Sequence, residues 1–243
     1  MSATEQGADP NSAGDPKSSP AEPAESIARV LTTRAETRAF YNKISKVYDL
    51  MAEHSEGPVR QKCLRKLAPK PGETLVEIGC GTGNVAASLA QAAGDHGRVY
   101  AVDISDGMLG QTRHLLETQG LGARVCLCCA DAEQLPLEDG SADAVFLSFT
   151  LELFDNPDIP AVLSECKRVL RRGGRLGVAS VTKEGHHELL VDAYEWTHRH
   201  FPNLLDCRPI FARRSMEAAG FEVLDSEVGM MWVPVEIVLA VKP

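Results

Sequence analysis

The stretch Val76–Val85, VEIGCGTGNV, places three glycines at alternate positions directly after an apolar run. These glycines are Gly79, Gly81 and Gly83, and the run before them reads as a buried strand. Glycine has no Cβ atom, so the backbone there can adopt positive φ angles and a ligand can approach it closely. In an open α/β sheet, ligands bind beyond the carboxyl ends of the strands. The stretch therefore predicts a ligand-binding turn between a strand and its following helix.

The spacing of the glycines separates three classes of ligand. A phosphate-binding P-loop ends in Gly-Lys followed by Ser or Thr, whereas Gly83 is followed by Asn84 and Val85. A dinucleotide fingerprint reads G-x-G-x-x-G, and Asn84 stands where its third glycine would fall, which disfavours NAD or FAD without excluding them. Glu77 lies two residues before Gly79. Its carboxylate would repel a pyrophosphate and would suit a ligand that carries an ammonium and a sulfonium.

Strands and helices alternate along the middle of the chain, and this alternation predicts the elements that position the turn. Near-continuous apolar runs are typical of parallel strands with both faces covered. We expect strands at Thr74–Ile78, Arg98–Val102, Arg124–Cys129, Ala144–Phe149 and Arg175–Val181, and helices at Asn84–Ala93, Gly107–Thr118 and Ile159–Leu170. The segments GFEVLDSEVGM and MWVPVEIVLAVKP read as an antiparallel pair at the sheet edge. The pattern predicts a doubly wound α/β fold with a seven-stranded, mostly parallel, Rossmann-like sheet.

The N-terminal part of the chain changes character after residue 26. Residues 1–26 are rich in Ser, Ala, Pro, Gly and acids and lack large apolar side chains, which predicts a disordered tail. Residues 27–243 are expected to form one domain whose N-terminal helices, residues 27–68, are part of a lid. Within them, Ile44, Val47, Tyr48 and Met51 are spaced as one helical face, and a short helix follows over PVRQKCLRKLA.

Composition and charge limit the classes of partner. The net charge is −9, of which residues 1–26, with five acids and one lysine, contribute −4. This balance argues against nucleic acid, because phosphate contacts need clustered Lys and Arg. The sequence has no apolar stretch long enough to cross a bilayer and no signal-peptide core, so we expect a cytoplasmic protein without a transmembrane segment.

The sequence contains seven cysteines, at positions 63, 80, 126, 128, 129, 166 and 207. Three of them, Cys126, Cys128 and Cys129, fall in the single predicted strand RVCLCCADA, with the first two on one side and the third on the other. Three thiols on one strand cannot converge on one metal ion. We therefore expect reduced cysteines in the core and no metal site.

The order of the motifs resembles that of class I S-adenosylmethionine-dependent methyltransferases, in particular the branch of the ubiquinone/menaquinone C-methyltransferases. VEIGCGTGN is similar to the first motif of this family, VYAVDIS to the second, and CADAEQLPLEDGSADAVFLSFTLELF to the third and fourth. YNKISKVYDLM resembles the N-terminal helix of the quinone branch, and VLRRGGRL resembles the turn before its fifth strand. The similarity runs from Ala39 to Val181, and the stretch SFTLELFDNPDIP departs from it in composition.

The resemblance implies S-adenosylmethionine as cofactor, S-adenosylhomocysteine as product, and a small-molecule acceptor that contains an apolar or planar part. Asp103, 24 residues after Gly79, can accept hydrogen bonds from both ribose hydroxyls. In the family, Ile104 and Met108 would flank the adenine and Asp131 would meet its amino group. The cofactor-binding residues implied are Tyr41, Tyr48, Glu77, Gly79, Cys80, Gly81, Gly83, Asp103, Ile104, Met108, Asp131, Ala132, Ser148 and Phe149.

No catalytic constellation stands out in the sequence. The sulfonium of S-adenosylmethionine already activates the methyl group, so the protein must place a nucleophile in line and exclude water. If a general base assists, Glu152 is the first candidate, followed by His186 or His187. Purely structural roles stay open for several residues. Asp131 could be a turn residue, Tyr41 and Tyr48 could be packing residues on one helical face, and Glu152 could be a solvated loop acid.

Two other functions stay open at this point. One is a non-catalytic S-adenosylmethionine-binding regulatory protein, and the other is a nicotinamide oxidoreductase on a similar sheet. The oligomeric state and the identity of the acceptor atom (carbon, oxygen, nitrogen or sulfur) are likewise open.

Overall fold

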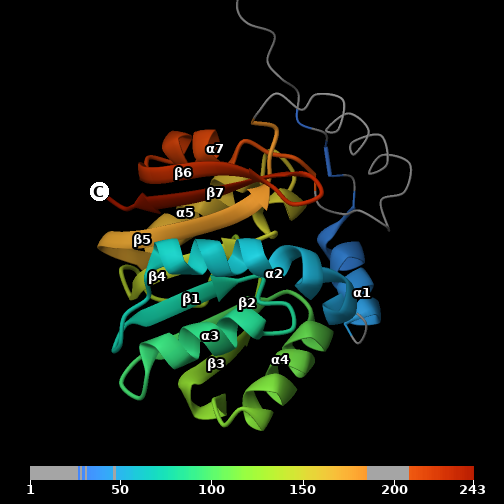
Figure 1. Cartoon of the computed structure of the whole chain (residues 1–243), viewed down its shortest axis with the longest axis vertical. Coiled ribbons are helices and arrows are strands. Elements are labelled where there is room, and N and C mark those ends of the chain that lie inside the picture. Colours follow the sequence, from blue (N-terminus) through green and yellow to red (C-terminus); the bar gives the residue numbers. More distant parts are fainter. Residues whose placement is uncertain (1–26, 28, 31, 46–47, 185–207) are drawn as a thin grey trace, which may run out of the picture.

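A seven-stranded sheet forms the centre of the molecule, with the strand order β3-β2-β1-β4-β5-β7-β6 (Figure 1). The computed structural model describes residues 27, 29–30, 32–45, 48–184 and 208–243, and for residues 48–54 it describes the backbone alone. The strands are β1 (Thr74–Ile78), β2 (Arg98–Asp103), β3 (Val125–Cys129), β4 (Ala142–Ser148), β5 (Leu170–Val181), β6 (Glu222–Met230) and β7 (Pro234–Val241). β1 to β5 are parallel, whereas β7 runs antiparallel to both β5 and β6.

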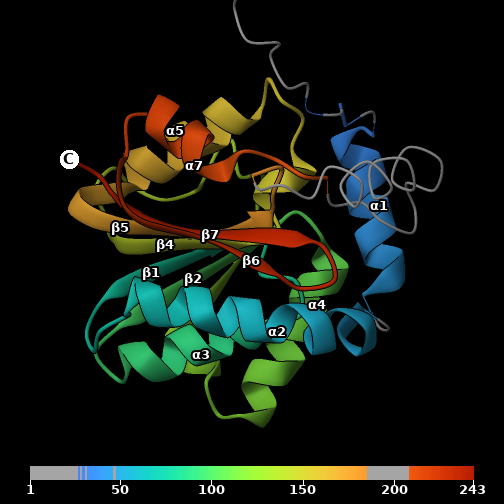
Figure 2. The same cartoon turned by 45° about the horizontal axis from the view of Figure 1, so that its top comes forward.

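Helices cover both faces of this sheet. They are α1 (Arg34–Ile44), α2 (Tyr48–Leu67), α3 (Asn84–Ala93), α4 (Asp106–Thr118), α5 (Ile159–Val169) and α7 (Ala212–Ala218). Figure 2 shows α2, α3 and α4 on one side of the sheet and α5 and α7 on the other. Each side buries its own apolar cluster, with Leu89 and Leu116 in one and Val162 and Leu163 in the other. The predicted doubly wound fold with an antiparallel C-terminal pair is confirmed.

Most boundaries of the predicted elements agree within two residues, but β5 begins at Leu170, five residues before its predicted start at Arg175. β1 and α3 have the predicted bounds. β4 ends at Ser148, one residue before its predicted end, because Phe149 has a φ angle of 50°. This left-handed conformation is rare for a residue with a side chain and cannot continue an extended strand. The strand therefore turns sharply at its carboxyl end, where ligands bind in this class of fold.

The N-terminal helices differ from the prediction. α1 ends at Ile44 and α2 begins at Tyr48, so Ile44, Tyr48 and Met51 do not share one helical face. For the same reason Tyr41 and Tyr48 lie on different helices. α2 does not start at Pro58 but continues through it. Its later turns are buried against the sheet, and this tertiary packing outweighs the hydrogen bond that a proline removes.

The cysteines are divided between the core and the surface. Cys63, Cys80 and Cys166 are buried, as predicted. Cys126 and Cys129 are exposed, so the prediction that they belong to the core is wrong. The reason is that β3 is the edge strand of the sheet and is paired only with β2. In the part of the chain that the structure describes, no helix combines the length and apolar character needed to cross a membrane.

Candidate functional site

The glycine turn joins β1 to α3 at the carboxyl end of β1. Gly79, Gly81 and Gly83 have φ angles of 70°, 53° and 92°. A Cβ atom on Gly79 would lie 2.4 Å from the Thr150 hydroxyl oxygen, and one on Gly83 would lie 2.6 Å from a methyl carbon of Thr112. A Cβ atom on Gly81 would meet nothing within 4 Å. Packing therefore requires glycine at positions 79 and 83, whereas Gly81 leaves open space beside the turn.

Asp103, at the end of β2, holds the apex of this turn. Its Oδ2 accepts a hydrogen bond from the Gly81 amide at 2.9 Å, and its Oδ1 accepts one from the Ser105 amide at 2.8 Å. Burial raises the pKa of Asp103, and the two amides oppose this shift. The N-cap of α4 is Ser105, whose hydroxyl accepts from the Met108 amide at 3.1 Å. The Asp103 carboxylate thus fixes the glycine turn, and Ser105, not Asp103, caps α4.

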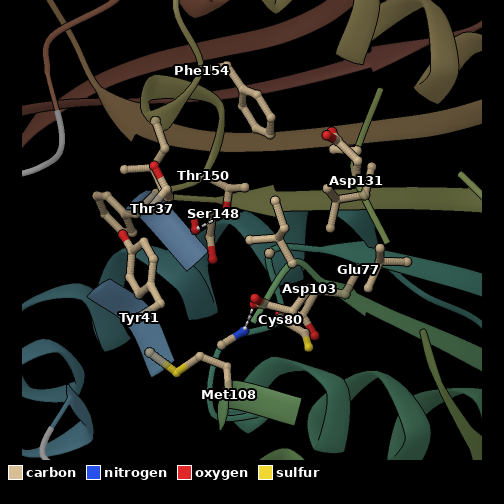
Figure 3. A pocket seen from close by; sticks show the side chains of 18 of the residues that line it. Thr37, Tyr41, Glu77, Cys80, Asp103, Met108, Asp131, Ser148, Thr150 and Phe154 are labelled. Atoms are coloured by element: carbon tan, nitrogen blue, oxygen red, sulfur yellow. Dashed lines mark hydrogen bonds between the residues drawn. The ribbon is translucent and has the colours of Figure 1, made fainter. Parts of the chain in front are cut away.

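A pocket that opens to solvent lies over the carboxyl ends of β1, β2, β3 and β4 (Figure 3). The predicted residues that line it are Tyr41, Glu77, Gly79, Cys80, Gly81, Asp103, Ile104, Met108, Asp131, Ala132, Ser148 and Phe149. Gly83 lies in the turn but does not line the pocket. The side chain of Tyr48, together with His186 and His187, lies outside the described residues.

Glu77 is a buried carboxyl group in the wall of this pocket, with only 3% of the residue exposed. Burial raises its pKa well above the usual range, and the guanidinium of Arg60 opposes that shift. The Ala86 amide hydrogen-bonds to this carboxyl group. Within the described part of the chain, Glu77 Oε2 has no hydrogen-bond partner. A buried oxygen in this state is an acceptor for a cationic donor such as an ammonium.

Acids outnumber bases along the pocket. The charged lining residues are Glu77, Asp103, Asp131, Asp155, Asp158, Arg34 and Arg60. An acidic lining attracts cationic ligands and repels polyanions. The remaining contacts include apolar side chains at two ends, with Ile104 and Met108 beside β2 and Phe149, Leu153 and Phe154 after β4.

Glu152 is not brought to the pocket. It lies in a single 3-10 turn, Leu151–Leu153, and is completely buried. Its Oε1 accepts a hydrogen bond from the Val181 amide at 3.0 Å, and burial raises its pKa to about 8. The neighbouring Leu153 lines the pocket, whereas Glu152 does not. Its catalytic role stays a prediction.

Several lining residues escaped the sequence analysis, among them Arg34 and Thr37 on α1 and Arg60 on α2. Arg34 forms ion pairs with Asp131 and Glu133, about a hundred residues further along the chain. A local signal for the start of α1 does exist, because Thr33 and Glu36 form a reciprocal capping box. That signal marks a helix, but it does not reveal which loop the helix covers.

Asp131 is a turn residue that also lines the pocket, and its contact with the adenine stays a prediction. Its Oδ1 accepts a hydrogen bond from the Glu133 amide at 3.1 Å, as a turn residue would. Its Oδ2 pairs with the guanidinium of Arg34, and the residue also lines the pocket.

Two solved structures share this architecture. The crystal structure of the [4+2]-cyclase SpnF has a TM-score of 0.73 and 19% sequence identity, over 87% of this chain and 97% of that one. A SAM-dependent methyltransferase from Aquifex aeolicus has a TM-score of 0.62 and 22% identity, over 83% of this chain and 98% of that one. At these identities the likeness shows the fold alone, and that fold is the Rossmann-like fold of the class I methyltransferases.

The sequence is similar to those of known methyltransferases. Residues 75–174 match the family described as the methyltransferase domain. The ubiquinone/menaquinone biosynthesis C-methyltransferase of Cupriavidus necator is 31% identical over 147 residues, which cover 59% of this chain and 59% of that protein. This chain covers less than two thirds of the length of the first curated relatives that it matches. The resemblance predicted from the motifs is confirmed: residues 75–174 match a methyltransferase domain, and the curated relatives include ubiquinone/menaquinone C-methyltransferases.

Proposed function

We propose that this chain transfers a methyl group from S-adenosylmethionine to a small-molecule acceptor by in-line displacement and releases S-adenosylhomocysteine. The observation that carries the proposal is the buried Glu77 carboxyl in the pocket wall, whose Oε2 has no partner among the described residues. A carboxyl in that position matches the ammonium of the cofactor, and it would disfavour the pyrophosphate of a nicotinamide dinucleotide.

The residues that line the pocket suit the ribose and the adenine of this cofactor as well as its ammonium. Gly81 offers a backbone with open space beside it. Each Asp103 oxygen accepts one amide hydrogen bond and keeps a second lone pair, which suits two ribose hydroxyls. Ile104 and Met108 are apolar neighbours for the adenine ring, and Asp131 is the acceptor for its amino group.

The lid expected from the sequence is part of this proposal. α1 contributes Thr37 and Tyr41 to the pocket, and Figure 3 shows both across the cavity from Asp131. We assign α1 and the beginning of α2 to a cover that closes the cofactor site. Covering the site would exclude water from the reacting groups.

When bound, the cofactor supplies a methyl group that its sulfonium activates for nucleophilic attack. The task of the protein is to hold the acceptor in line, and positioning alone can contribute roughly 7–11 kcal/mol. Phe149, Leu153 and Phe154 form the apolar end of the pocket and suit an acceptor with an apolar or planar part. The acidic lining makes nucleic acid an unsuitable acceptor. A dedicated base is required only if the acceptor atom is protonated and weakly acidic.

Turnover is the decisive measurement, because the fold alone does not establish methyl transfer. SpnF shares this fold and is named as a [4+2]-cyclase. Purified protein is incubated with methyl-labelled S-adenosylmethionine and a small-molecule extract of its host. Formation of S-adenosylhomocysteine and partition of the label between organic solvent and water are measured, with Asp103→Ala as the binding-deficient control. We expect extract-dependent label in the organic phase, and label in a water-soluble product would point to a polar acceptor. Tight binding of S-adenosylhomocysteine without transfer to any extract component would favour the non-catalytic alternative.

A further inference from the structure

The contacts of α1 with the rest of the molecule are ionic and polar at every turn. Arg34, Arg38 and Asn42 are spaced four residues apart and so lie on one face of the helix. None of the 11 residues of α1 is buried. Phe40, Tyr41 and Ile44 are partly buried, and none of them belongs to the apolar core clusters of the described residues. We call Arg34, Arg38 and Asn42 the docking stripe.

The first member of the docking stripe binds the loop after β3. The Arg34 guanidinium pairs with Asp131 and with Glu133, and it lies 3.6 Å from a carboxylate oxygen of Asp158. These three acids come from loops at the carboxyl edge of the sheet. The Arg34 side chain is 39% exposed, so water and salt reach this contact.

The other two members bind the start of α4. Arg38 pairs with Asp106, which also accepts a hydrogen bond from the Cys129 thiol. Asn42 Oδ1 accepts hydrogen bonds from the Ser105 hydroxyl at 2.6 Å and from the Gly107 amide at 2.9 Å. These contacts lie beside Asp103 and Met108, at the ribose and adenine end of the pocket.

Docking of α1 and completion of the pocket wall are therefore the same event. Thr37 and Tyr41 lie between the stripe residues in sequence and line the pocket. Arg38, Asn42 and Asp106 do not line it. Figures 1 and 2 agree that α1 stands at the margin of the molecule, where it packs against α4. A small change in the docking free energy thus changes access to the site without changing the residues that touch a ligand.

We propose that α1 is an electrostatically docked gate, and that the docking stripe sets how long the cofactor stays bound. The inference rests on the proposed function, since it concerns the same site. Exposed ion pairs contribute roughly 0.2–1 kcal/mol each, which is small enough for reversible opening. Salt weakens exposed ion pairs, and the screening length falls to about 3 Å at 1 M ionic strength. Rising ionic strength therefore opens the gate, and Arg38 and Asp106 are positioning residues that act through α1.

A charge swap at the stripe tests the gate. The variants are Arg38→Glu, Asp106→Arg and the double variant, with Arg124→Glu as a matched control that breaks an exposed ion pair with Asp95 far from the pocket. The dissociation rate of S-adenosylhomocysteine is measured at low and high salt. We expect each single variant to release it roughly fivefold faster at low salt, the equivalent of about 1 kcal/mol. The double variant restores slow release, and the Arg124 variant matches the wild type.

Hydrogen exchange of the α1 amides, measured without ligand, separates this inference from the proposed function. The gate predicts that protection of α1 falls with salt and in the Arg38→Glu variant, and that it returns in the double variant. Unfolding free energies of all variants are measured alongside, since a collapse of α4 would also speed release. Equal protection and equal release in wild type and Arg38→Glu would overturn the gate. Failure of the wild type to bind S-adenosylhomocysteine, with the exchange pattern as expected, would instead reject the proposed function.

Discussion

The Asp103 carboxylate accepts a hydrogen bond from the Gly81 amide at 2.9 Å and so joins the end of β2 to the apex of the glycine turn after β1. The two residues lie on neighbouring parallel strands, whose register pairs Ile78 with Val102. The same carboxylate accepts from the Ser105 amide at the start of α4. One side chain thus fixes three segments beside the switch point of the sheet, which lies between β1 and β4.

Replacing Asp103 by alanine is expected to weaken S-adenosylhomocysteine binding by about 100-fold or more. The two ribose hydroxyls would lose hydrogen bonds to a charged acceptor, each of which contributes about 1.5–3 kcal/mol. Isothermal titration calorimetry measures the affinity, and Asp139→Ala provides an exposed-acid control. An affinity equal to that of the wild type would contradict a role for Asp103 at the site.

The alanine variants of Gly79 and Gly81 are expected to fail in different ways. Gly79→Ala should lower the unfolding free energy by about 2–4 kcal/mol, because its Cβ would lie 2.4 Å from the Thr150 hydroxyl oxygen at a positive φ angle. Gly81→Ala should cost only about 1 kcal/mol of strain, since nothing lies within 4 Å of its Cβ. Its larger effect should be on ligand affinity. Denaturant titrations and calorimetry on both variants check this, with Gly72→Ala as a control for positive φ in open space.

Glu77→Gln keeps the shape of the side chain and removes its charge. In the ligand-free protein burial holds the pKa of Glu77 well above its usual range, and an ammonium beside it would lower that pKa. Binding of S-adenosylhomocysteine should therefore release a proton from the wild type, and affinity should rise with pH up to the raised pKa. Calorimetry in buffers of different ionisation enthalpy detects this proton. The variant should bind at least tenfold more weakly and release none, with unchanged or greater stability. Proton release that persists in the variant would assign it to another group.

Glu152 should make the stability of the protein depend on pH. Its pKa rises from an ordinary value of 4.5 to about 8 on folding, so the folded state binds the extra proton between these values. The contribution to stability is complete below about pH 4.5 and is lost as the pH rises through about 8. The slope that this group adds is at most about 1.4 kcal/mol per pH unit.

Glu152→Gln should remove that part of the slope in unfolding titrations, whereas Glu138→Gln, at an exposed position, should leave it. Methyl transfer measured on the same protein tests the catalytic hypothesis. Turnover that is unchanged across pH would leave Glu152 as a structural residue, and a loss of turnover with an intact fold would make it catalytic.

The amino-acid sequence by itself determined the strand, glycine turn and helix that carry the site. This information is local: an apolar run of strand length, glycines where φ is positive, and an acid at the end of the next strand specify β1, α3 and Asp103 over short distances. The motif order then predicted the fold class, and most predicted site residues line one pocket because carboxyl ends of parallel strands meet at one edge.

Only the tertiary structure decided which side chains meet across long stretches of chain. The exposure of Cys126 follows from the edge position of β3, and the burial of Glu152 follows from the turn that packs it against the end of β5. The pairing of Arg34 with Asp131 joins residues that no local pattern connects. Periodicity reports which face of an element is apolar, but not which element covers it. For that reason a lid formed by residues 27–68 was predicted, but the contacts through which α1 docks over the pocket were not.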